Sequence, residues 1–114
     1  MIGQVLRSDV YWVDLDPVRG WELARTGPCV IVSASELNAV RRTVVIVPLT
    51  TTKSPATWPL LIDMPSQGTE SKARIEQIRV IDKSRLKKRI DKVSRVDMAQ
   101  LESALGLLLN IGTP

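Results

Sequence analysis

Arg74 and Glu76, two positions apart in the segment KARIEQIRVID, are the charged pair best placed to do chemistry. In an extended strand, side chains at positions i and i+2 lie on the same face, with Cα atoms about 6.5–7 Å apart. A carboxylate beside a guanidinium can accept a proton while the cation stabilises negative charge. The same spacing also suits a surface ion pair worth at most about 1 kcal/mol, so both interpretations stay open.

Three consecutive threonines, Thr50, Thr51 and Thr52, follow directly on the apolar run VVIVPL. A hydroxyl at the end of a strand can donate a hydrogen bond to an anion. Threonine also favours strands and strand exits through packing alone, which is the structural alternative at this position.

Trp21 lies between Arg19 and Arg25 in a segment with mixed charge and two glycines, which predicts a loop over residues 17–27. An exposed indole between cations can stack on an unpaired base of a nucleic acid. The alternative is an apolar lid over the core of the domain.

The sequence has no histidine, and this absence excludes several kinds of site. Paired-histidine nuclease sites, Ser-His and Cys-His nucleophile systems and His-rich transition-metal sites are all excluded. Any acid–base catalysis must therefore come from Asp, Glu, Lys, Arg, Tyr or hydroxyl groups.

Positive charge is concentrated in one segment of the chain. The formal net charge is +4, but residues 72–95 contain ten Lys or Arg and three acidic residues, a local charge of +7. Such a segment predicts a surface for phosphates or for an acidic peptide, and the alternative is a solvated face with ordinary ion pairs.

The elements that must position these residues are mostly short β-strands within one domain, residues 1–114. Apolar and β-branched runs predict strands at Val10–Leu15, Cys29–Ala34, Arg42–Leu49, Leu60–Met64, Lys72–Asp82 and Leu86–Val93. After Ser94 the apolar period changes to that of a helix, and Ser94 with Asp97 resembles a capping box. The order predicts a mainly β domain, a small antiparallel barrel or sheet with a C-terminal helix packed on it (α+β).

Several further properties are expected from composition. The surplus apolar residues of the helix, Leu107 among them, predict burial in a homodimer. No apolar run is long enough to span a membrane, and the N-terminus lacks a signal-peptide core, so we expect a cytoplasmic protein. The single cysteine, Cys29, is expected to be a buried apolar residue in a reducing compartment.

Four ordered motifs resemble the MazF/PemK family of toxin endoribonucleases over essentially the whole chain. They are RSDVYWVDLDPVRGWE (7–22), GPCVIVSASELN (27–38), VIVPLTT (45–51) and IEQIRVIDKSRL (75–86). The resemblance implies an SH3-like barrel that works as a homodimer and cleaves single-stranded RNA with no metal or other cofactor. It also implies a 2′,3′-cyclic phosphate product, a 5′-hydroxyl product, and inhibition by an antitoxin with a flexible acidic tail.

The resemblance also assigns roles to individual residues. Thr50 matches a threonine that contacts the scissile phosphate, while Arg74 and Glu76 match a catalytic arginine and carboxylate. We expect Glu76 to be the base and Arg74 to stabilise charge, because arginine is a poor acid at neutral pH. Glu22 matches a loop carboxylate implicated in activity. Residues expected to contact RNA are Arg19, Trp21, Arg25, Thr51, Lys53, Gln77 and Arg79.

Gly27 departs from the family pattern. Relatives usually carry an arginine immediately before Pro28, and that arginine clamps the phosphate. Three interpretations remain open: Arg25 covers a gap of about 7 Å, the chain binds RNA but cleaves it poorly, or Gly27 is an engineered substitution. The alternatives to a nuclease are a non-cleaving RNA- or antitoxin-binding module and a gyrase poison of the CcdB type.

Overall fold

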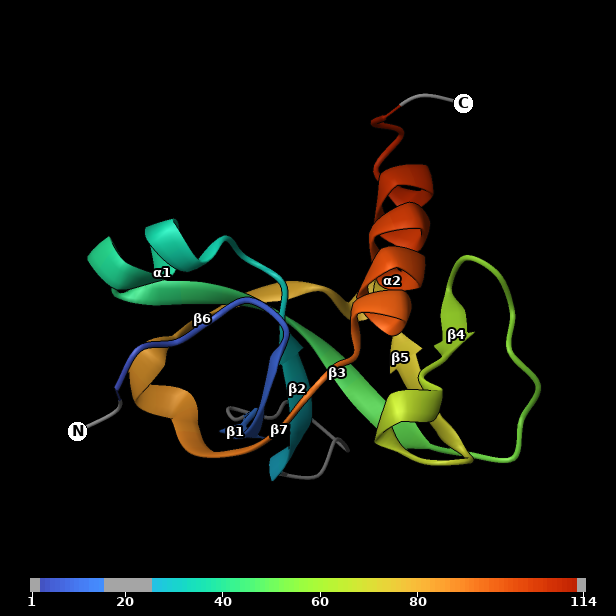
Figure 1. Ribbon diagram of the computed structural model, residues 1–114, viewed down its shortest axis with the longest axis horizontal. Helices are drawn as coiled ribbons and strands as arrows, with labels where there is room; N and C mark the ends of the chain where they lie inside the picture. Colours follow the sequence, from blue (N-terminus) through green and yellow to red (C-terminus); the bar gives the residue numbers. More distant parts are fainter. Residues whose placement is uncertain (1–2, 16–25, 113–114) are drawn as a thin grey trace, which may run out of the picture.

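The computed structural model describes residues 3–15 and 26–112, which form an antiparallel sheet with one long helix packed on it (Figure 1). The strands are β1 (Asp9–Asp14), β2 (Thr26–Ile31), β3 (Thr43–Thr51), β4 (Leu61–Asp63), β5 (Ser71–Arg74), β6 (Arg79–Asp82) and β7 (Leu86–Lys92). The helices are α1 (Ser35–Val40), α2 (Arg95–Leu108) and three 3-10 turns, η1 (Pro65–Gln67), η2 (Ile75–Gln77) and η3 (Lys83–Arg85). The predicted mainly β domain with a C-terminal helix is confirmed.

The nine-residue strand β3 organises the sheet, whose order is β4-β5-β3-β2-β1-β7 with β6 also paired to β3. The start of β3 pairs with β6 and its end pairs with β5, so two short strands share one edge of β3. The expected barrel is not closed, because in the described residues β4 and β7 stand at opposite ends of the order without pairing.

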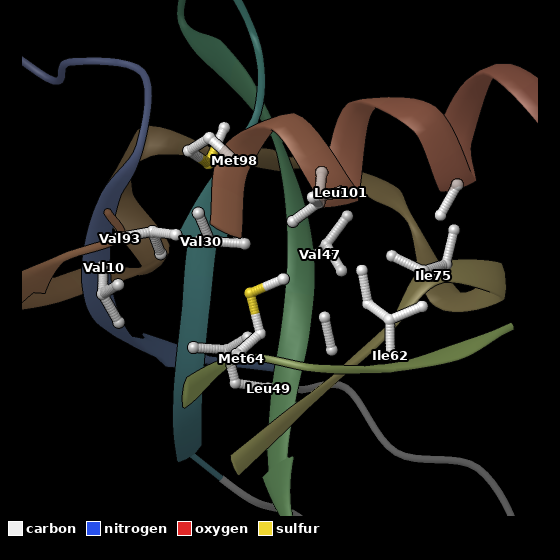
Figure 2. Packing of buried hydrophobic residues seen from close by; sticks show 12 residues of the cluster. Val10, Val30, Val47, Leu49, Ile62, Met64, Ile75, Val93, Met98 and Leu101 are labelled. Atoms are coloured by element: carbon white, nitrogen blue, oxygen red, sulfur yellow. The ribbon is translucent and has the colours of Figure 1, made fainter. Parts of the chain in front are cut away.

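Apolar side chains form two cores, one on each face of β3. Val47 and Leu49 point to one face with Val30, Ile62 and Met64, and α2 covers this face through Met98, Leu101 and Ala104 (Figure 2). The second core lies on the opposite face and contains Tyr11, Val13, Cys29, Ile31, Val44, Ile46, Ile81 and Leu86. Because side chains alternate between the two faces of a strand, the even-numbered residues of β3 lie on the face away from α2.

Helix α2 begins as the sequence predicts. The Ser94 hydroxyl accepts a hydrogen bond from the Asp97 backbone N–H at 3.1 Å. The Asp97 carboxylate instead accepts from the Ser66 backbone N–H at 2.7 Å, which ties the helix to the turn before β5. In the described ranges no helix is long and apolar enough to cross a membrane.

Two local expectations were wrong. The predicted strand Lys72–Asp82 is interrupted by η2, because Ile75 turns into the core at 0% exposure and the Ile78 N–H closes a turn onto the Ile75 carbonyl. Helix α1 was not predicted. It forms around Asn38, whose buried amide donates to the carbonyls of Ser33 and Val5. The contact with Val5 spans 33 residues, too far in sequence for a local pattern to indicate.

Candidate functional site

Thr50 lies in a row of side chains that crosses the sheet near the end of β3. It stands directly opposite Lys72 on β5, and Lys72 stands opposite Asp63 on β4. On the other side, β2 and β3 last pair at Cys29 and Pro48, and each chain continues two residues further, to Gly27 and Thr50. Since two residues restore the same face of a strand, Gly27, Thr50, Lys72 and Asp63 share one face.

This shared face is the one away from α2. Thr50 is half-buried at its rim, and Thr51 alternates to the opposite face, where it pairs with the buried Ser71. Thr50 was expected to contact the scissile phosphate and Thr51 to contact RNA beside it. The structure instead places the two side chains on opposite faces of β3. Of the two threonines, only Thr50 lies beside Lys72, the cation of the row.

Arg74 and Glu76 are not neighbours on a strand, as the sequence analysis expected. Arg74 is the last residue of β5, opposite Leu61, whereas Glu76 lies in the turn η2. Both side chains are exposed, and they make no ion pair with each other in the described structure. Arg74 shares the face of Lys72 two residues along β5, and Glu76 follows in η2, after the strand has ended.

The other predicted RNA contacts in the described ranges are exposed but spread out. Arg79 opens β6 opposite Ile46, on the same face as Thr50. Its positive charge reaches the Cys29 thiol, whose pKa burial raises to about 12 while Arg79 opposes that rise. Gln77 ends η2, and Lys53 lies two residues after β3. Cys29 is buried, as predicted.

The backbone at Gly27 has room for a side chain. A Cβ atom built there meets only the Leu15 side chain, at 3.9 Å, which is an ordinary van der Waals contact. Gly27 also pairs with Val13 within the β1–β2 ladder, so its conformation is that of a regular strand. An arginine at this position would start on the face of Thr50. The predicted residues Arg19, Trp21, Glu22 and Arg25 lie outside the described residues.

Lys72 is a residue of the candidate site that was not predicted from the sequence, where it was counted only as one charge of the basic segment. It is buried, with a 6% exposed fraction, and its ammonium donates to the Thr52 carbonyl at 3.0 Å. Asp63 lies 3.5 Å from the same nitrogen. The sequence pattern that could have indicated Lys72 is the alternation of side chains along a strand, which puts Lys72 and Arg74 on one face.

The site is cationic and made of side chains rather than metal ligands. Within residues 3–15 and 26–112, no group of three His, Cys, Asp or Glu side chains could hold a metal ion. Further basic residues lie on β7, three strands from β3 in the sheet, where every position from Lys87 to Lys92 is exposed. Such an arrangement can hold a phosphodiester through hydroxyl and ammonium or guanidinium donors.

Comparison with known sequences relates the whole chain to one kind of protein. A family model described as a PemK-like, MazF-like toxin of a type II toxin-antitoxin system matches residues 6–109. The chain is 35% identical over 113 residues to endoribonuclease MazF9 of Mycobacterium tuberculosis, covering 92% of this chain and 96% of that protein. It is 31% identical over 111 residues to endoribonuclease MazF of Staphylococcus epidermidis, covering 94% and 92% respectively.

Solved structures share the fold. An endoribonuclease from a mycobacterial species superposes with a TM-score of 0.79 at 28% identity, covering 99% of this chain and 98% of that chain. A second, solved with its cognate antitoxin, gives 0.78 at 27% identity, covering 99% and 100%. Because the family match spans nearly all of the described fold and includes the row through Thr50, the chain belongs to the family of PemK-like, MazF-like toxins of type II toxin–antitoxin systems.

Proposed function

We propose that this chain is the toxin of a toxin–antitoxin pair and cleaves single-stranded RNA at short sequences without a metal ion. The observation that carries the proposal is the face at the end of β3, where Thr50 lies beside Lys72 and Arg74. It occurs in a chain whose relatives, over more than nine-tenths of its length, are named endoribonucleases. A hydroxyl donor among fixed cations suits the phosphodiester of a nucleic acid.

The reaction needs the RNA, water and the side chains of Thr50, Arg74 and Glu76. The ribose 2′-hydroxyl attacks the neighbouring phosphorus, and Glu76 takes its proton. Arg74 stabilises the negative charge that develops on the phosphate oxygens, while Thr50 donates to one of them. The bond from phosphorus to the 5′-oxygen breaks, and that oxygen takes a proton from water. The products are a 2′,3′-cyclic phosphate and a 5′-hydroxyl.

The exposure of Arg74 and Glu76 supports these roles. Both side chains are exposed to solvent, at and just beyond the end of β5, where an extended RNA can reach them. Because they form no ion pair with each other, neither charge is neutralised by the other before the substrate arrives. Arg74 ends β5 and Glu76 lies within the turn η2, so the proposed cation and the proposed base are held by two different elements.

Two partners complete the proposal. Helix α2 leaves Val96, Leu107 and Leu109 exposed by 51–73%, and we assign this surface to a homodimer. The acidic flexible tail of an antitoxin would bind the basic segment that also receives the RNA, as charge complementarity favours. One solved relative was obtained with its cognate antitoxin. The site of action is the cytoplasm, where the RNA substrates are.

The test is cleavage of a mixed-sequence single-stranded RNA in EDTA, followed by mapping of the cut ends. We expect cyclic phosphate ends, and a rate lowered at least about a hundredfold by Glu76→Gln, because general base catalysis contributes that much. Glu36→Gln, an exposed acid on α1, is the matched control and should cut like the unmodified chain. A Glu76→Gln variant that cuts at the full rate would contradict the assignment.

Gly27 favours a second candidate, a module of the same fold that binds RNA or antitoxin without cleaving. A glycine provides no fixed charge where family members usually carry arginine. This candidate predicts binding of RNA without any cut ends under the same conditions. Growth inhibition that persists in a Glu76→Ala variant would instead point to a gyrase poison.

A further inference from the structure

Lys72 is the one lysine or arginine that is buried in the described part of the chain, and the reaction above gives it no part. The buried polar and charged residues there are Asp9, Asn38, Ser71, Lys72 and Asp97. Asp9 and Asp97 are tied to backbone N–H groups at chain turns, and Asn38 to two carbonyls. These are structural ties away from the site, whereas Lys72 lies in the row of Thr50.

The contacts of Lys72 fix the end of β3. Side chains directly opposite on neighbouring strands have Cβ atoms about 4.5–5.5 Å apart, so Lys72 starts beside Thr50. Its ammonium then reaches along β3 to the Thr52 carbonyl, at 3.0 Å. The Thr52 N–H donates to the Glu70 carbonyl, also at 3.0 Å. Both backbone polar groups of Thr52, two residues beyond Thr50, are thus held, one by Lys72 and the other by Glu70, the residue before β5.

The charge of Lys72 is only loosely neutralised. Its partner Asp63 lies 3.5 Å away, but the Asp63 side chain is 63% exposed while that of Lys72 is 8% exposed. Water screens an exposed carboxylate more than it screens a buried ammonium, so part of the positive charge remains effective on the face of Thr50. Gly27, on the other side of Thr50, adds no charge of its own.

We propose that Lys72 is a positioning residue that fixes Thr50 and supplies, from within the sheet, a positive charge for the RNA phosphate, with Asp63 as the partner that limits it. The proposal rests on the proposed function, since it assumes that the phosphate binds at Thr50. It explains how a site with glycine at position 27 keeps a fixed cation beside that threonine. It also makes Asp63 a residue that weakens RNA binding.

The test measures binding of a mixed-sequence, single-stranded 2′-O-methyl RNA, which lacks the nucleophile, at several salt concentrations. Asp63→Asn should tighten binding about two- to fivefold, and the slope of log K against log salt should become more negative, by at most about 0.7. Glu36→Gln makes the same change in net charge on α1, which lies at the other end of β2 and β3 (Figure 1), and should leave Kd unchanged. Equal effects of the two substitutions would overturn the proposal.

Substitutions of Lys72 itself test the same charge. Lys72→Met keeps the length and apolar stem, and should weaken binding about tenfold and flatten the salt slope by about 0.7. Lys72→Arg keeps the positive charge and should therefore retain most of the affinity and most of the salt slope of the unmodified chain. If Lys72→Met does not fold, as judged by circular dichroism, the Asp63→Asn and Lys72→Arg results still decide, since a merely structural lysine would leave the salt slope unmoved.

A Thr50→Val variant separates the two proposals. If it binds and cuts RNA like the unmodified chain, the site does not include Thr50, and both the site assignment in the proposed function and the role of Lys72 fail. If it loses cleavage while Asp63→Asn behaves like Glu36→Gln, the site stands and only the role of Lys72 is refuted. Loss of cleavage together with tighter binding by Asp63→Asn supports both.

Discussion

Replacing Gly27 with arginine should restore a phosphate clamp to the candidate site. The new side chain would start on the face of Thr50, two residues beyond the last pair of β2 and β3. Its Cβ atom meets only the Leu15 side chain, at 3.9 Å, so the strand need not move. A glycine within a strand also costs roughly 0.5–1 kcal/mol relative to alanine, so we expect the variant to be at least as stable.

The expected gain in rate follows from the kind of donor that is added. Removing one preorganised donor to a developing oxyanion costs about a hundred- to thousandfold in kcat, or roughly 2.7–4 kcal/mol. Gly27→Arg should therefore raise the cleavage rate about a hundredfold or more. The gain should come at the lower end if Lys72, which stands on the other side of Thr50, already supplies part of the charge.

The assay compares initial rates on the same mixed-sequence RNA in EDTA and maps the ends produced. Gly27→Met is the matched control, because it adds a long side chain and stiffens the strand without adding charge. It should cut no faster than the unmodified chain. Equal rates for glycine and arginine would refute the reasoning and show that the charge comes from another residue, with Arg25 and Lys72 to be tested next. A gain shared by methionine would refute the electrostatic explanation.

Two further predictions concern stability. Leu101 lies on the buried face of α2 at 0% exposure, and Leu101→Ala should lower the free energy of unfolding, measured by urea titration, by about 2–5 kcal/mol, because a cavity remains in the core. In the same urea titration Leu37→Ala, at a residue of α1 that is 55% exposed, should cost much less, and similar costs would contradict the packing. Burial raises the pKa of Cys29 from 9.0 to about 12, so the neutral thiol contributes stability that is complete below about pH 9 and is lost as the pH rises toward 12. Cys29→Ala should lose less stability than the unmodified chain between pH 8 and 11 in the same titration, and parallel curves would refute this.

Local sequence patterns determined the elements of this protein. Apolar and β-branched runs predicted five of the strands with bounds that lie within three residues of the observed ones. Such side chains pack well on a pleated surface whatever their partners are. The change of period after Ser94 set the helix, and the Ser94 hydroxyl caps it through a contact only three residues away. The motifs determined the family in the same way, because they are ordered stretches of residues that need no partner to be recognised.

Tertiary structure alone decided which residues meet. A strand pattern gives the face of each side chain relative to its own neighbours, but register between strands depends on packing across the whole sheet. Only the pairing of β3 with β5 brings Lys72 beside Thr50, 22 positions apart in sequence, and only the burial of Ile75 breaks the strand that would have aligned Arg74 with Glu76. In the sequence Lys72 is one residue of a charged segment. In the structure it is a buried cation of the candidate site, because it lies between β3 and β4 and the Thr52 carbonyl accepts a hydrogen bond from its ammonium.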